Sequence, residues 1–246
     1  MDSKIVSFLL ISLLTMSSCS DDDATTTSTT EIPEVYKKIY GATDMYVEGS
    51  FIFIKVNGRP DHKSPYYQNT QWSSLYEAYN GSNANFVINP NRIASFNYTF
   101  KIPLNPVSAS TKSATPLGPI GVSLNGVPFY NQYAAGNSPL TNEINSFDQY
   151  NGHPQQQGGY HYHVEPLYLT STKGKTSLLG FLLDGFPVYG PTENGKTVLN
   201  SDLDAYHGHT HATADFPNGI YHYHITSTDP YINGSGFYGT AGTITQ

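Results

Sequence analysis

The sequence predicts a mainly β protein, either sandwich-like or built as two β units that pack together. Three observations support this fold class. The 246 residues contain 22 glycines, 16 prolines and 20 tyrosines, a composition that favours short strands and turns over long helices. Apolar and polar residues alternate with period two along several segments, which is the pattern of a half-buried strand. Finally, residues 118–172 recur as residues 177–231, so the second half of the chain is an internal tandem duplication.

The first element is an export signal over residues 1–18. After Lys4 the run IVSFLLISLLTM is apolar but short for a membrane span, and small residues follow it before Cys19, the single cysteine. A cysteine in this position resembles the lipid-modified first residue of bacterial lipoproteins, so we expect a mature chain that begins at an acylated Cys19. An ordinary cleaved signal followed by an incidental thiol is the alternative.

The next segment, residues 19–34, is expected to be a flexible tether. Its run SDDDATTTSTTEIP is acidic, rich in threonine and nearly free of apolar residues, so it has little apolar surface to pack. The Ser-Asp-Asp-Asp after Cys19 also resembles the acidic surface-export tag of some Gram-negative lipoproteins. We therefore expect an outer-membrane lipoprotein that its N-terminal lipid attaches to the membrane. The acidic tag also predicts that the protein is exposed on the cell surface.

Residues 35–246 are expected to form one domain, whose N-terminal β portion covers residues 35–117. The run FIFIKVNG (51–58) has strand composition and stops at an Asn-Gly hairpin signal. The run RIASFNYTFKIPL (92–104) alternates apolar with polar residues and predicts a second strand.

Two segments of this portion depart from the strand pattern. Residues 71–80 predict one short amphipathic helix, because four apolar and aromatic side chains have helical spacing: Trp72, Leu75, Tyr76 and Tyr79. The Pro- and Ser-rich loop at 104–119 is interpreted as the boundary to the histidine-rich portion, residues 118–246.

The histidine-rich portion consists of the duplication, in which three blocks recur in the same order. GVSLNGVPFY (121–130) corresponds to GFLLDGFPVY (180–189), DQYNGH (148–153) to DAYHGH (204–209), and GGYHYH (158–163) to GIYHYH (219–224). Each unit therefore contains an Asx-Gly hairpin, a Gly-His block and a Tyr-His-Tyr-His strand. A unit of about 60 residues would not readily bury a core alone, so we expect the two units to pack together about a pseudo-two-fold axis.

These blocks carry a resemblance to a known family. NGVPFYN, GHPQQQGGYHYH, LLGFLLDGFPVYGP and GIYHYHITSTDPY, with the upstream VNGRPDH and VINPNRI, resemble the YHYH-domain family of exported bacterial proteins. The resemblance covers about residues 47–240. It implies export, and it assigns neither a biochemical role nor a catalytic residue.

The Tyr-His-Tyr-His strands place two histidines on one face. Residues two apart on a strand share a face and lie about 6.6 Å apart, so two such imidazoles can converge on one metal ion at about 2.0–2.1 Å from each nitrogen. The Gly-His block supplies a third candidate, because its glycine lets the loop approach closely. The candidate metal ligands are therefore His153, His161 and His163 in the first unit, and His209, His222 and His224 in the second.

Further candidates surround these six. Asp148 and Asp204 each precede a Gly-His histidine by five residues, and they are expected to fix an imidazole tautomer or to ligate the metal through oxygen. His207 and His211 flank His209 and have no counterpart in the first unit, so they rank as optional ligands. The duplication leaves open whether there are two sites or one, and we favour one shared site at the junction of the units, where clefts form.

Imidazole ligands without a thiolate suit zinc, copper or iron better than calcium or magnesium, so a transition metal is the expected cofactor. One alternative is a Tyr-rich carbohydrate- or peptide-binding lipoprotein whose histidines are structural and satisfied by hydrogen bonds. Another is a His/Tyr metal-dependent oxidoreductase or hydrolase, so the sequence does not decide whether the protein is an enzyme. The net charge of −7, without a basic stripe, argues against a nucleic-acid partner. A small-molecule or glycan ligand is compatible with the sequence, which does not predict an oligomeric state.

Overall fold

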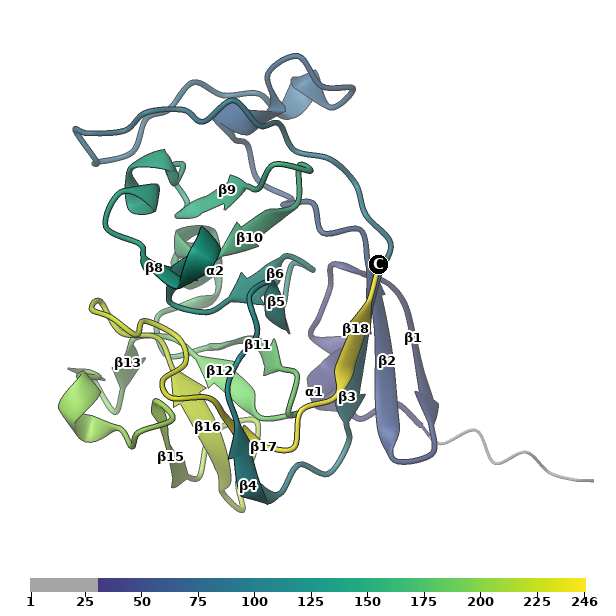
Figure 1. Ribbon diagram of the computed structural model, residues 1–246. Helices are drawn as coiled ribbons and strands as arrows, with labels where there is room; N and C mark the ends of the chain where they lie inside the picture. The colour runs from purple at the N-terminus through teal and green to yellow at the C-terminus, as the bar shows by residue number, and fades with distance from the viewer. Residues whose placement is uncertain (1–30) are drawn as a thin grey trace, which may run out of the picture.

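The computed structural model describes residues 31–246, and the protein is mainly β, as predicted (Figure 1). The export signal expected at 1–18, Cys19 and most of the tether expected at 19–34 lie outside the described residues. The described part has two α-helices, α1 Glu34–Lys37 and α2 Leu167–Lys173. Its 3-10 turns are η1 Pro65–Tyr67, η2 Ser73–Leu75, η3 Ala135–Asn137, η4 Glu143–Ser146 and η5 Asn200–Asp202. No helix within residues 31–246 is long and apolar enough to cross a membrane.

The larger sheet contains both units of the duplication. Its strand order is β15-β16-β12-β11-β5-β6-β10-β9, and in Figure 1 it extends from β9 at the top to β15 at the bottom. The first unit supplies β5 Pro119–Ser123, β6 Pro128–Tyr130, β9 Gly152–Pro154 and β10 Tyr160–Tyr162. The second unit supplies β11 Leu178–Leu182, β12 Pro187–Tyr189, β15 Gly208–His211 and β16 Ile220–His224.

The order of the strands is symmetrical about the central pair, β5 and β11. These two strands are antiparallel, with Val122 directly opposite Phe181. Because these two residues occupy equivalent positions in the duplicated hairpins, the register places a pseudo-two-fold axis between them, as the tandem repeat predicted. From this axis each unit extends outward in the same sequence of hairpin, Tyr-His-Tyr-His strand and Gly-His strand.

The two duplicated hairpins close on their Asx-Gly turns. Gly126 and Gly185 have φ of +80° and +87°, a left-handed conformation that costs glycine nothing. By contrast, Asn57-Gly58 ends a strand without closing a hairpin, because the strand before it pairs with one that begins only at Tyr98. The hairpin predicted at that position is therefore wrong.

The smaller sheet lies beside the larger one, at the right of Figure 1. Its order is β1-β2-β3-β18, with strands β1 Ala42–Glu48, β2 Phe51–Val56, β3 Tyr98–Pro103 and β18 Thr243–Thr245. Strands β2 and β3 alternate between buried and partly exposed side chains. Their inward residues, such as Ile54 and Phe100, join Phe181 of β11 in one core, and Tyr36 of α1 packs against the Phe181 ring at 4.5 Å between centroids. The two sheets thus share a core, which makes the fold sandwich-like.

Three local features differ from expectation. The helix expected over 71–80 is confined to the 3-10 turn η2, because Tyr76 is extended and bridges to Ser64. The loop expected at 104–119 contains β4 Ser108–Ser113, which pairs with β17 Phe237–Gly239. Helix α2 was not predicted, and its segment LYLTSTK is rich in serine and threonine, which have low helix propensity. The remaining strands form two short hairpins, β7 Tyr133–Ala134 with β8 Ser138–Pro139 and β13 Thr192–Glu193 with β14 Lys196–Thr197.

Candidate metal centres

The first candidate centre is built on the antiparallel pair β9 and β10. His153 of β9 lies directly opposite His161 of β10, and directly opposite residues share one face of a sheet with close Cβ atoms. His163 follows His161 by two residues and therefore lies on the same face. The Gly-His block needs its glycine, because a Cβ at Gly152 would lie 2.4 Å from the Tyr160 ring.

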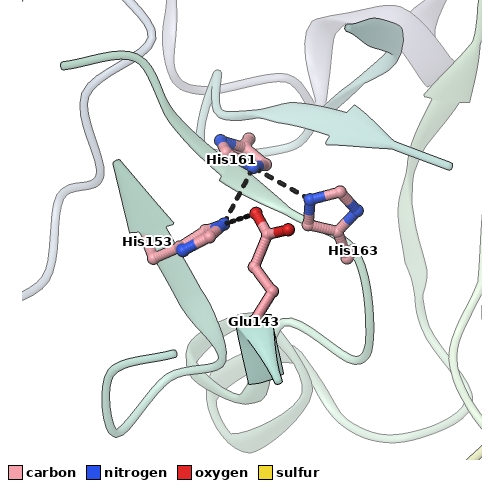
Figure 2. A group of neighbouring side chains, drawn as sticks. All are labelled: Glu143, His153, His161 and His163. Atoms are coloured by element: carbon pink, nitrogen blue, oxygen red, sulfur yellow. Dashed lines mark hydrogen bonds and ion pairs between the residues drawn. The ribbon is translucent and has the colours of Figure 1, made fainter. Parts of the chain in front are cut away.

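The three imidazoles of this centre converge through their Nε2 atoms (Figure 2). The Nε2 atom of His161 lies 3.1 Å from that of His153 and 2.9 Å from that of His163. Glu143, which begins η4, points its carboxylate into the same space, with Oε1 3.1 Å from Nε2 of His153. One donor atom from each of these four residues lies within 4.8 Å of all the others, so the group could hold a metal ion.

The outward nitrogens of these imidazoles determine their tautomers. Nδ1 of His161 lies 3.0 Å from the carbonyl of Gly159, and Nδ1 of His163 lies 2.5 Å from the carbonyl of Asn131. A carbonyl only accepts, so both Nδ1 atoms carry the hydrogen and both Nε2 atoms of the neutral rings carry a lone pair.

His153 has the same tautomer for a different reason. Its Nδ1 lies 2.8 Å from the hydroxyl of Ser146, and that hydroxyl donates its own hydrogen to the carbonyl of Glu143. The Ser146 oxygen therefore accepts from Nδ1–H, which leaves a lone pair on Nε2 of His153 as well. Three lone pairs and a carboxylate thus face one point without a hydrogen between the neutral rings, an arrangement that a cation stabilises.

Burial keeps His161 and His163 neutral. Burial, followed by the charges of His153 and His163, holds the pKa of His161 well below its usual value. Burial, and then the His153 charge, lowers the pKa of His163 to about 4. Burial raises the pKa of Glu143, but the hydrogen bond to His153 and the histidine charges outweigh it, so the pKa of Glu143 is lowered. Neutral imidazoles and an ionised carboxylate are the forms that bind metals.

The second candidate centre repeats this construction on β15 and β16. His209 lies directly opposite His222, and a Cβ at Gly208 would lie 2.5 Å from the Tyr221 ring. Nδ1 of His222 lies 2.9 Å from the Ile220 carbonyl, and Nδ1 of His224 lies 2.8 Å from the Gly190 carbonyl. The Nε2 atoms of His209, His222 and His224 are buried without a hydrogen-bond partner.

Glu193 of β13 supplies the carboxylate of the second centre. Its oxygens lie 3.4 Å from Nε2 of His209, 3.5 Å from Nε2 of His222 and 3.8 Å from Nε2 of His224. His211, ranked only as optional from the sequence, belongs to this group, with Nδ1 3.1 Å from Glu193. Glu193, His209, His211 and His222 together could hold a metal ion, and His224 lies beside this group, with Nε2 3.8 Å from Glu193.

The second centre is less enclosed than the first. The His153, His161 and His163 residues are all at most 3% exposed, whereas the side chains of His209 and His211 are 17% and 47% exposed. Burial lowers the pKa values of His222 and His209 as it does in the first unit, and it lowers that of His224 to about 4.

Asp148 and Asp204 were expected to contact the imidazoles or the metal, but they bind tyrosine hydroxyls instead. Asp148 accepts from the hydroxyls of Ser64 and Tyr160 at 2.6 and 2.8 Å and from two backbone N–H groups of its own turn. Asp204 likewise accepts from the Tyr221 hydroxyl at 2.9 Å. Both aspartates lie in the turns that precede β9 and β15, and these turns bring them to the tyrosine hydroxyls. Backbone carbonyls hold the imidazoles of His161, His163, His222 and His224 instead.

The remaining histidines lie apart from both centres. His207 occupies the turn position of Asn151, and both residues have the left-handed φ, +73° and +65°. Its Nε2 lies 3.0 Å from the Thr226 hydroxyl, so it is not part of the second centre. His62 is buried, with Nε2 3.1 Å from the Tyr162 hydroxyl.

The expected shared site at the junction of the units is wrong. Strands β10 and β16 are separated in the sheet by four others, β6, β5, β11 and β12. The hairpins occupy the pseudo-two-fold axis, so the Tyr-His-Tyr-His strands lie on their outer sides. Each unit gathers its own histidines, and residues 31–246 contain two candidate centres instead of one.

Comparison with known proteins agrees with the motifs. The model of the family described as YHYH protein matches residues 99–200 and 192–236, and these stretches include both Tyr-His-Tyr-His strands and all ligand candidates of both centres. The upstream blocks VNGRPDH and VINPNRI lie outside the matched residues. No curated protein and no solved structure matches the chain. Because the match covers more than half of the 246 residues, the chain belongs to the YHYH protein family.

Proposed function

We propose that this chain is an exported, lipid-anchored protein that binds two transition-metal ions, one in each unit of the duplication. In the first unit the ligands are His153, His161, His163 and Glu143. In the second unit they are His209, His222, His224 and Glu193, with His211 beside them. Zinc, copper and iron suit this donor set of imidazoles and one carboxylate.

One observation carries the proposal. At the first centre three Nε2 atoms approach within 2.9 to 3.1 Å of a neighbour, and the three Nδ1 atoms already hold the hydrogens. A hydrogen-bonded ladder without metal would need a hydrogen in each of these contacts, and neutral rings have none left to give. Two ligands at tetrahedral angles about a zinc ion lie about 3.3 Å apart, so an ion fits with small shifts of the rings.

Metal stoichiometry tests the proposal. We expect two equivalents of zinc per chain, one equivalent for His161→Ala, one for His222→Ala and none for the double variant, measured by elemental analysis after dialysis. His207→Asn is the matched control and should keep two equivalents, because Asn151 occupies the equivalent turn position with the same left-handed φ. Far-UV circular dichroism checks that each variant keeps its sheets. Two equivalents in all variants would contradict the proposed ligands.

Export and anchoring rest on the N-terminal sequence. A short apolar run followed by a single cysteine and an acidic stretch supports acylation of Cys19. The expected result is a lipid on Cys19 by mass spectrometry of the membrane fraction, and loss of Cys19→Ser protein from that fraction. A Cys19→Ser protein that stays in the membrane fraction would contradict the anchor.

A further inference from the structure

The second metal centre opens into a cavity of about 730 Å³. Glu193 and His224, two of its ligand candidates, line this cavity together with Tyr40 and Tyr189. The volume falls within the range of about 300–1,000 Å³ that is typical of small-molecule sites. A ligand in this cavity would therefore lie against Glu193 and His224 of the metal centre.

The charge of the cavity is opposite to that of the whole protein. The chain carries a net charge of −7 with only 12 lysines and arginines, yet three lysines line this cavity: Lys37, Lys38 and Lys173. Glu193 and Asp215 are the two carboxylates of the lining. A divalent ion bound at Glu193 would make the cavity more positive still, so it favours an anion.

The lysines differ in how they are already paired. Lys38 contacts Asp215, which also accepts a hydrogen bond from Tyr189 at 2.8 Å. Lys37 pairs with Glu31 and Glu34, whose side chains are mostly exposed, and exposed pairs are weak enough for another anion to displace. Lys173 lies over the Tyr40 ring with Nζ 4.8 Å from its centroid. Lys37 and Lys173 are thus the cations most available to a ligand.

The donor set of the second centre also allows an exchangeable position. Four side chains form the group that could hold the ion, and the half-exposed His211 is the one that a ligand could displace. Structural zinc sites are filled by four protein ligands, whereas sites that act on a substrate keep a position for it. The first centre, with four inward ligands and nearly complete burial of its histidines, corresponds to the structural kind.

From these observations we propose that the second centre binds a small organic anion, a carboxylate or a phosphate ester, between the metal ion and the lysines of the cavity. This inference rests on the proposed metal binding and adds the ligand class to it. The apolar side chains of Leu124 and Leu178, which also line the cavity, suit an organic body attached to the acidic group. The first centre then stabilises the fold, and the second recognises the ligand.

The test uses the full chain loaded with cobalt, whose visible absorption reports a change of ligands, and phenyl phosphate as the probe. We expect one equivalent of phenyl phosphate to bind by calorimetry and to change the cobalt spectrum, with benzyl alcohol as the neutral probe that does neither. Lys37→Ala combined with Lys173→Ala should weaken phenyl phosphate binding by at least about tenfold, because the loss of even one charge-assisted hydrogen bond has that effect, with two cobalt ions retained. Lys55→Ala, on the exposed Asp44 ion pair of β1 and β2, is the matched control and should not change the affinity.

The outcomes separate this inference from the proposed function. A chain that binds no cobalt would overturn both. Two bound cobalt ions with no phenyl phosphate binding, or equal affinity in the Lys37/Lys173 variant, would overturn only the anion site. Equal binding to the metal-free chain would also overturn it, because the anion would then not touch the ion.

Discussion

At the scale of single residues, the site depends on which nitrogen of each imidazole is free. The sequence predicted the six histidines, because strand alternation and the Gly-His blocks fix their faces without knowledge of the fold. It did not predict the glutamates. Glu143 and Glu193 are 50 residues apart, whereas the duplicated blocks are 56 to 61 apart, so they do not align. One signal was present, since Glu143 is the only carboxylate between the first hairpin and the Asp148 turn.

The depressed histidine pKa values predict how pH affects the metal-free chain. A histidine with a lowered pKa adds stability above its unfolded pKa of about 6.5, and this stability is lost as the pH falls toward the folded pKa. Burial lowers seven histidine pKa values, those of His62, His161, His163, His207, His209, His222 and His224. Asp184 has the opposite effect on the pH dependence, because burial raises its pKa to about 6. It is one group, however, against seven histidines.

We therefore expect the free energy of unfolding of the metal-free chain to fall by several kcal/mol between pH 6.5 and pH 4, at about 1.4 kcal/mol for each pKa unit. Urea unfolding at a series of pH values measures this. His163→Ala removes a group whose folded pKa is about 4, so the free energy of unfolding of this variant should fall less steeply with decreasing pH. Zinc should stabilise the chain at pH 7 and have no effect at pH 4, because protonated imidazoles do not bind metal. A free energy that stays flat over this window would show that the histidines are not held neutral.

At the scale of elements, each Tyr-His-Tyr-His strand separates two tasks on its two faces. The imidazoles face the candidate metal centre, and the tyrosine hydroxyls bind the turns that hold the strand, as Tyr160 binds Asp148 and Tyr223 binds Asp184. Strand alternation made these faces predictable from sequence. The role of the aspartates was not predictable. Their turns bring them to the tyrosine face only once β9 pairs with β10 and β15 pairs with β16.

Tyr160→Phe tests this division of tasks. It leaves the buried Asp148 without one donor, so we expect the free energy of unfolding to fall by about 1–3 kcal/mol, while two equivalents of zinc remain. Tyr46→Phe is the matched control, because Tyr46 is exposed on β1, and it should change neither quantity. Loss of a metal ion from Tyr160→Phe would instead support tyrosine ligation, as in a His/Tyr oxidoreductase.

At the scale of the whole molecule, the duplication predicted the symmetry but not the separation of the centres. Equivalent hairpins can meet at the axis with the Tyr-His-Tyr-His strands either inside or outside. The hairpins lie inside because their strands are entirely buried, with Gly121 and Gly180 packed against backbone atoms of the facing strand. Strands β17 and β18 also escaped prediction, since each pairs with a strand more than 100 residues earlier.

The separation of the centres predicts that their metal ions bind independently. Five strand steps of about 4.8 Å place β10 and β16 about 24 Å apart. Two divalent ions at that distance in water repel by about 0.7 kcal/mol, and screening with a Debye length of about 8 Å reduces this to less than about 0.1 kcal/mol. The affinity of the second centre in His161→Ala should therefore stay within about twofold of its value in the native chain. Competition with a chromophoric chelator measures it, and His222→Ala gives the reciprocal value for the first centre. A tenfold change at the remaining centre would mean that the sheet couples the two, through the hairpins at its axis.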